Sequence, residues 1–371
     1  MVLISEKWLW VVMIINVTMR SLNHLLYVLG CLLMLVVQTS CSVIDEDLSD
    51  CAPQASLNYD LQLVTNMTTE LQTELTTQTD ILLANEIKQY LSDIFSDFAH
   101  DVDLSFYDTE GDSALLQKDK HIMDANQASY VLNLPMRQYM HLAAANVVDN
   151  ELVTVANDNY CHRSQLSQVI RDTIDSHTTG VFTARQPMEV LGDVSQNFNV
   201  HLYMANCAAA LVIDPRDRET LEDIHVYSTG FATGFNICDS IYQYDRWAPI
   251  VRTSLVGLDR LTKGAFISVN FPSKEPASSS TRNVIETEEP FIAEPGEETL
   301  WEFRAYVPHK RVVGTRTETT VTETVLRVKE PLRAGQFKII NCWVGPNDEI
   351  RTQDPDVSTS ITFDWNPGLE F

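Results

Sequence analysis

The sequence predicts an all-β protein of two tandem β-sandwich domains with a few helices, preceded by a cleaved export signal. Short stretches in which apolar and polar residues alternate recur along the chain, and this is the period of half-buried strands. Turn residues, mainly Gly, Pro and Asp, separate these stretches, as in sandwich folds. Residues 41–371 are long enough for two domains, each with its own core.

The export signal is predicted from the apolar run at residues 25–37, which leads through a small polar patch to Cys41. The run is shorter than the roughly 20 residues that a membrane-spanning helix needs, and it is typical of a signal peptide. A cysteine directly after small residues is typical of bacterial lipoproteins, so we expect cleavage after residue 40 and a lipid on Cys41. An ordinary signal peptide with an incidental cysteine is the alternative. Met19, followed by a single Arg, is a second possible start, and residues 1–40 are signal peptide in either case.

Acidic residues follow the cysteine at Asp45, Glu46 and Asp47. They are similar to the acidic tether by which some bacteria with two membranes send lipoproteins to the outer cell surface. We therefore expect residues 41–55 to be a lipid-bearing tether. The whole chain has a formal net charge of −25 and no cluster of Lys and Arg, so nucleic acid is not an expected partner.

Alternation and helical spacing predict the first elements in order. Residues 56–64 alternate apolar with polar side chains and are a predicted strand. Residues 73–98 carry apolar side chains three and four apart, which predicts an amphipathic helix laid over a sheet. Residues 161–175 are predicted to be a short helix or a loop. Further strands are expected at residues 102–106, 130–134 and 139–148.

A second series of strands opens near residue 199 and continues into an apolar run at residues 208–213. The domain boundary is expected between residues 186 and 199, which gives an N-terminal domain at 56–195 and a C-terminal domain at 196–371. A Pro/Ser/Glu-rich stretch at residues 272–298 predicts a surface loop. The remaining strands are expected at residues 224–229, 265–271, 300–307, 319–328, 337–344 and 360–365.

Neither metal binding nor catalysis is indicated by sequence motifs. No CxxC pair, HExxH, GxSxG or Gly-rich phosphate loop is present, so we expect no metal site, no enzymatic activity and no cofactor except the covalent lipid. His162, His201 and His225 are interpreted as structural residues. The cysteines other than Cys41 that follow the signal can form at most two disulfides, with the pairing left open: Cys51, Cys161, Cys207, Cys238 and Cys342.

Several segments together resemble one known family. They are the acidic segment leading into LNYDLQL, then LSFYDTEGD, YVLNLPMRQYMHLAAAN, RAYVPHK, TRTETTVTETVLRVKEPLRAGQFKII and ITFDWNPG. These resemble the FimB-type anchor fimbrillins, the lipoprotein subunits of type V pili, over almost all of residues 41–371. The chain departs from the family at Met136–Tyr139, where relatives commonly carry a Gly before the tyrosine.

The resemblance implies two transthyretin-like sandwiches and a structural role. The protein would be lipid-anchored at the outer membrane, on the cell surface, with fimbrial shaft subunits as partners. Its function would be to anchor a pilus and to limit the pilus length.

The last predicted strand is a candidate for joining such a filament by β-strand exchange. Ile361, Phe363 and Trp365 alternate along it and form one apolar face. The alternative is that this strand only completes its own domain.

Two other function classes remain open in the sequence. A surface glycan-binding lipoprotein would need exposed, coplanar tryptophans among Trp247, Trp301, Trp343 and Trp365. A lipid-anchored hydrolase would need catalytic side chains that converge in one cleft.

Overall fold

A computed structural model describes the chain from residue 54 to residue 365 with internal gaps. Within that part strands predominate, and the predicted all-β class with a few helices is confirmed. None of the helices described there is long and apolar enough to cross a membrane. The signal peptide, Cys41 and the acidic residues 45–47 lie outside the described residues. The gaps are residues 65–66, 77–79, 96–100, 110–114, 123–128, 149, 157–158, 193–194, 245–249, 258–262, 277–298 and 314–315.

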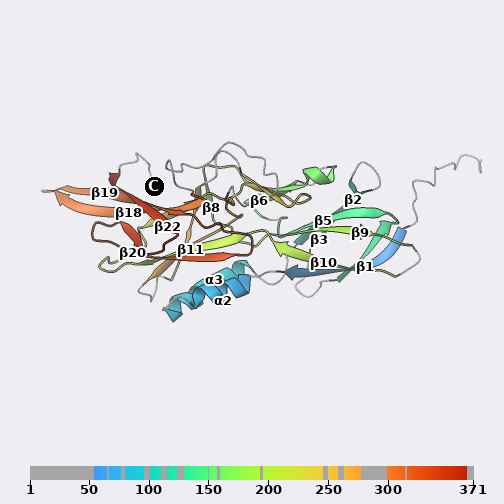
Figure 1. The fold of residues 1–371 in the computed structure, drawn as a ribbon, viewed down its shortest axis with the longest axis horizontal. Helices are drawn as coiled ribbons and strands as arrows, with labels where there is room; N and C mark the ends of the chain where they lie inside the picture. The colour runs from blue at the N-terminus through green and yellow to red at the C-terminus, as the bar shows by residue number, and fades with distance from the viewer. Residues whose placement is uncertain are drawn as a thin grey trace, which may run out of the picture. The chain divides into compact units, whose positions relative to one another are not determined.

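The first sandwich is built on a seven-stranded sheet with the order β3-β2-β5-β9-β10-β1-β4 (Figure 1). Leu57, Tyr59 and Leu61 alternate along β1 and are buried, as the sequence pattern predicts. They share one core with Leu104 and Phe106 of β2. The bounds are β1 (Gln54–Val64), β2 (Asp101–Asp108), β3 (Leu115–Ile122), β4 (Ser129–Pro135), β5 (Gln138–Ala145), β9 (Phe182–Glu189) and β10 (Asn197–Met204).

A four-stranded sheet, β14-β13-β7-β6, packs on the other face of this large sheet. Tyr107 and Leu142 from the large sheet and Leu166 and Phe235 from the small one meet in this second core. A disulfide between Cys161 and Cys238 cross-links the small sheet region. The bounds are β6 (Val153–Ala156), β7 (Gln165–Gln168), β13 (Gly234–Asn236) and β14 (Ile241–Gln243), with a 3-10 turn, η1, at Cys161–Arg163.

The second sandwich packs a five-stranded sheet, β16-β17-β11-β20-β21, against a six-stranded sheet, β22-β19-β18-β12-β15-β8. Leu211 and Ile340 of the first sheet and Trp301, Phe303 and Leu326 of the second are buried together between them. The five-stranded sheet contains β11 (Cys207–Asp214), β16 (Ser254–Val256), β17 (Gly264–Asn270), β20 (Phe337–Val344) and β21 (Ile350–Thr352). The six-stranded sheet contains β8 (Thr173–Asp175), β12 (His225–Thr229), β15 (Ile250–Arg252), β18 (Trp301–Val313), β19 (Arg316–Val328) and β22 (Val357–Trp365).

Two helices in the described chain, α2 (Met67–Leu75) and α3 (Ile81–Ile94), lie on the five-stranded sheet (Figure 1). The prediction of one helix over residues 73–98 is therefore wrong in its bounds. Asp80 explains why α3 begins where it does, because its Oδ1 accepts hydrogen bonds from the backbone N of Leu82 (3.1 Å) and Leu83 (3.2 Å). These bonds satisfy donors that would otherwise be orphaned at the start of α3.

Strand pairing crosses the expected domain boundary at residues 195 and 196. β10 follows the boundary, yet it pairs in parallel with β1 from Asn58↔Asn197 to Val64↔Tyr203. The small sheet joins β7 to β13, and the six-stranded sheet joins β8 to β15. Alternation along β10 predicts a strand there but carries no information about which sheet it enters.

Candidate functional site

The open edge of β22 is the feature that the predicted strand exchange requires. β22 ends the order of the six-stranded sheet and pairs with β19 from Val328↔Val357 to Val321↔Trp365, with an irregularity between Val321 and Glu323. No other strand of the described chain pairs with β22. Its outer edge therefore presents backbone N–H and C=O groups that another strand can bond.

The end of β22 differs from its beginning in register and in burial, because the pairing with β19 shifts by one residue between Thr362 and Trp365. Ile361 lies opposite Thr324, which is fully buried, so Ile361 is on the core side of the sheet. Phe363 follows two residues later, yet its side chain is 52% exposed. Trp365 pairs through its backbone with Val321, one residue out of the register that sets Ile361 opposite Thr324, and its side chain lies outside the described residues. Of the predicted residues whose side chains are described, Ile361 is therefore half-buried and Phe363 is exposed.

A buried ion-pair group holds β22 to its neighbours. Arg327 of β19 donates through Nη1 to Ser360 Oγ of β22 at 3.0 Å, and its Nε lies 3.8 Å from Glu302 Oε2. Glu302 is only 2% exposed in its side chain and accepts from Arg304 Nε at 2.6 Å. A carboxylate so far from water requires such partners, so this group fixes the edge strand in place.

A second ion-pair network fixes the long β18–β19 hairpin. Arg218 donates to Asp348 (2.8 Å), to Asp223 (2.7 Å) and to the carbonyl of Pro308 in β18 (3.1 Å). His309 of β18 contacts the same Asp348 at 2.5 Å. The hairpin is thereby attached to the turn that precedes β21.

Glu349 closes that turn. Its carboxylate accepts from the backbone N of Asn347 at 2.8 Å and from Arg351 Nε at 2.7 Å. Burial opposes ionisation of Glu349, but these bonds outweigh it and hold its pKa below the usual range. The charged form of Glu349 is therefore part of the fold.

The two tryptophans whose side chains the structure describes, Trp301 and Trp343, do not form an exposed, coplanar platform. Trp301 is buried and donates its indole Nε1 to the carbonyl of Glu330 at 2.9 Å. Trp343 is half-buried and lines a pocket on the five-stranded sheet. Trp247 and the Trp365 side chain lie outside the described residues.

Two histidines of the described chain, His141 and His177, are buried, and neither of them was predicted from the sequence. His162, His201 and His225 are all exposed, whereas His141 and His177 are buried. Burial lowers the pKa of His141 and that of His177 to about 4. No local pattern marks these two positions, because their burial depends on which faces of the sheets are covered.

Side chains from distant segments surround His177. Its Nδ1 contacts Asn206 Nδ2 at 2.9 Å and its Nε2 contacts Gln168 Nε2 at 3.2 Å. His177 is therefore neutral and joins β7 to the connection between β10 and β11. In the described chain, no three His, Cys, Asp or Glu side chains lie together as a metal site would require.

Neither a protein-family model nor a curated protein sequence matches this chain. Solved structures with a similar backbone path do exist. The fimbrial anchor protein Mfa2 from Porphyromonas gingivalis is 9% identical with a TM-score of 0.42, covering 84% of this chain and 99% of that one. A proposed adhesin from Bacteroides thetaiotaomicron is 9% identical with a TM-score of 0.45, covering 82% and 98%. A fimbrial assembly protein from Parabacteroides distasonis is 12% identical with a TM-score of 0.34, covering 84% and 100%.

Proposed function

We propose that this chain is a surface lipoprotein that anchors a type V pilus to the outer membrane and limits its length. The lipid is attached at Cys41, and the acidic residues 45–47 direct the protein to the cell surface. The observation that carries the proposal is the open β22 edge, on which Phe363 is an exposed apolar residue. The sequence resemblance to anchor fimbrillins supports the same role.

The pairing of β22 suggests how a filament subunit would join it. β22 is held to β19 by seven paired positions and by the Arg327–Ser360 hydrogen bond, so leaving the sheet would break all of these contacts. Adding a partner strand at its outer edge breaks none of them and gains backbone hydrogen bonds together with burial of Phe363. We therefore infer that β22 stays in its sheet and accepts a strand.

The disulfide and the lipid fit a protein outside the cytoplasm. Disulfides persist in oxidising compartments, and the Cys161–Cys238 bond supports export of the chain. Each buried CH₂ of an acyl chain contributes about 0.8 kcal/mol, so several chains on one cysteine make detachment slow. Slow detachment is what an anchor under tension requires.

Deletion of the gene tests the proposal. Cells without the protein should still make filament subunits but should release filaments into the medium, often of abnormal length. Restoring the unaltered chain should return the filaments to the cells. If the protein is instead a glycan-binding lipoprotein, the deletion will leave filaments attached and remove polysaccharide binding.

A further inference from the structure

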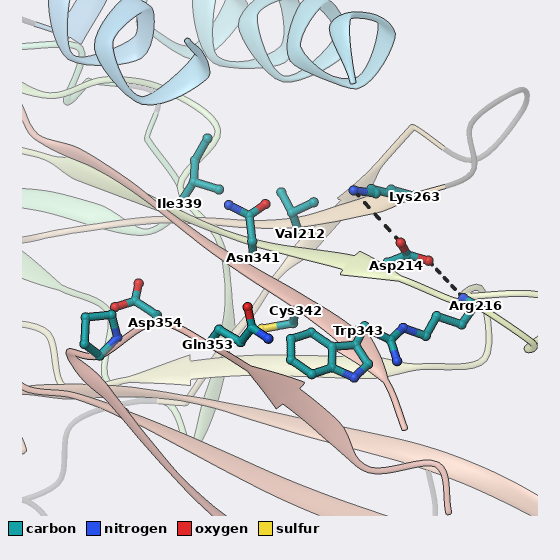
Figure 2. A pocket seen from close by; sticks show the side chains of 11 residues that line it. Val212, Asp214, Arg216, Lys263, Ile339, Asn341, Cys342, Trp343, Gln353 and Asp354 are labelled. Atoms are coloured by element: carbon teal, nitrogen blue, oxygen red, sulfur yellow. Dashed lines mark hydrogen bonds and ion pairs between the residues drawn. The ribbon is translucent and has the colours of Figure 1, made fainter. Parts of the chain in front are cut away.

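A pocket of about 420 Å³ lies on the outer face of the five-stranded sheet (Figure 2). Parallel pairing of β11 with β20 sets Val212 beside Asn341 and Asp214 beside Trp343 on this face. Val212 and Ile339 belong to the core that the helices help to bury, while Asn341 is exposed. The pocket is thus the part of this face that α2 and α3 leave uncovered.

One wall of the pocket is a stacked Arg–Trp pair. The guanidinium carbon of Arg216 lies 4.7 Å from the centre of the Trp343 ring. Arg216 has a φ of 53°, a left-handed conformation that is unfavourable for a residue with a side chain. Asp214 Oδ1 supports it by accepting from the Arg216 backbone N at 3.0 Å. This turn places the Arg216 guanidinium over the Trp343 ring.

The pocket also offers exposed polar groups that form no hydrogen bond with the rest of the described chain. The side-chain amides of Asn341 and Gln353 and the indole N–H of Trp343 make no hydrogen bond within the described chain. Asp354 uses one carboxylate oxygen to accept from the Asp356 backbone N at 3.0 Å. An amide both donates and accepts, which matches a hydroxyl or acetamido group that also does both.

The charges around the pocket balance. Lys263 Nζ lies 4.0 Å from Asp214 Oδ2, and Arg216 and Asp354 supply one further charge of each sign. The pocket therefore has no net attraction for phosphate or another anion. Its volume is within the range of small-molecule sites, and the half-buried Trp343 ring gives it one apolar wall, whereas Val212 and Ile339 are covered in the core.

We propose that this pocket binds one or two units of an uncharged saccharide. The C–H face of a sugar ring packs on the Trp343 ring, and its hydroxyl groups bond the exposed amides of Asn341 and Gln353. This proposal does not rest on the anchor role, because none of these residues belongs to β22. It adds a binding activity that a pilus anchor can carry at the cell surface.

Binding of simple sugars to the full chain, as the cells make it, tests the proposal. The probes are glucose, galactose, mannose and N-acetylglucosamine, together with their disaccharides. Saturation-transfer NMR detects binding of each sugar, and calorimetry measures its affinity. Asn341→Ala and Gln353→Ala should each weaken binding by about tenfold, the value of one well-formed hydrogen bond. Both side chains are exposed, so both variants should unfold at the same temperature as the unaltered chain.

Gln62→Ala is the matched control, because Gln62 is an exposed amide on β1 outside the pocket. It should leave binding unchanged. Failure of every uncharged probe to bind at about 10 mM would overturn the proposal, as this corresponds to less than about 3 kcal/mol of affinity. Equal binding by the Asn341→Ala and Gln353→Ala variants would also overturn it. Tighter binding of glucuronic acid or glucose 6-phosphate than of glucose would contradict the uncharged ligand class.

Discussion

At the scale of single residues, His177 makes the stability of the protein depend on pH. Its pKa is about 4 in the folded chain, against 6.5 for an ordinary histidine, because the side chain is buried. Between these values the unfolded chain binds a proton that the folded chain does not. The stabilising contribution is therefore complete above pH 6.5 and falls by about 3 kcal/mol as the pH decreases to about 4.

The measurement is the free energy of unfolding in urea at about pH 7 and about pH 4.5. His177→Asn should lose less stability between these conditions than the unaltered chain. The exposed His201→Asn serves as the control and should behave like the unaltered chain. If both variants lose the same amount, His177 is not the source of the pH dependence.

Cys41 is the residue on which membrane attachment depends in our proposal. Cys41→Ala removes the thiol that carries the lipid, so the protein should move from the membrane fraction to the soluble fraction. Cys41→Ser keeps the size of the side chain and should behave in the same way. Mass spectrometry of the amino terminus provides the direct measurement, and an unmodified terminus at another residue would contradict lipid attachment there.

At the scale of elements, Asp80 determines where α3 begins. Asp80→Ala removes the acceptor for the backbone N of Leu82 and Leu83 and should lower the free energy of unfolding by about 1 kcal/mol. Asp93→Ala is the control, because Asp93 is an exposed aspartate in the last turn of the same helix, away from its N-terminus. Urea unfolding should show a loss for Asp80→Ala alone. An equal effect of both substitutions would show that charge, and not capping, is responsible.

Local sequence pattern predicts some elements of this fold and cannot predict others. Alternation identifies β1 and β22, because each buries part of one face. It does not identify β3, whose sequence LLQKDKHI lacks alternation, or β8, which is three residues long. The exposure of Phe363 also could not be predicted, since Phe363 lies at the register shift between β22 and β19, which alternation along β22 does not encode.

At the scale of the whole molecule, the two predicted domains are interleaved. Residues 55–371 form one compact unit. The Cys161–Cys238 disulfide and the pairing of β8 with β15 both connect residues on either side of position 195. Distant pairing of this kind depends on the three-dimensional path of the chain, and a sequence pattern of period two does not encode it. A force applied at β22 is therefore transmitted through strands that come from both parts of the sequence.

Phe363 on β22 allows a test of how the whole molecule joins a filament. Phe363→Ser on the end strand β22 removes an exposed apolar side chain that we propose a partner strand buries. Cells with this variant should release more filaments into the medium, because a buried Phe side chain contributes about 2 kcal/mol to such a contact. The proposed partner is a filament subunit, so the effect should appear in the attached fraction of filaments and not in the amount of anchor displayed.

Val131→Ser is the matched control for this experiment. Val131 is 66% exposed on β4, the end strand of the seven-stranded sheet, so both substitutions remove an exposed apolar group from an edge. Only Phe363→Ser should affect filament retention, measured as filament subunit in the medium relative to that on cells. Replacing Ile361, Phe363 and Trp365 together by Ser extends the test to the whole face. If this displayed variant still retains filaments, β22 is not the joining strand, and the attachment must lie at another edge of the molecule.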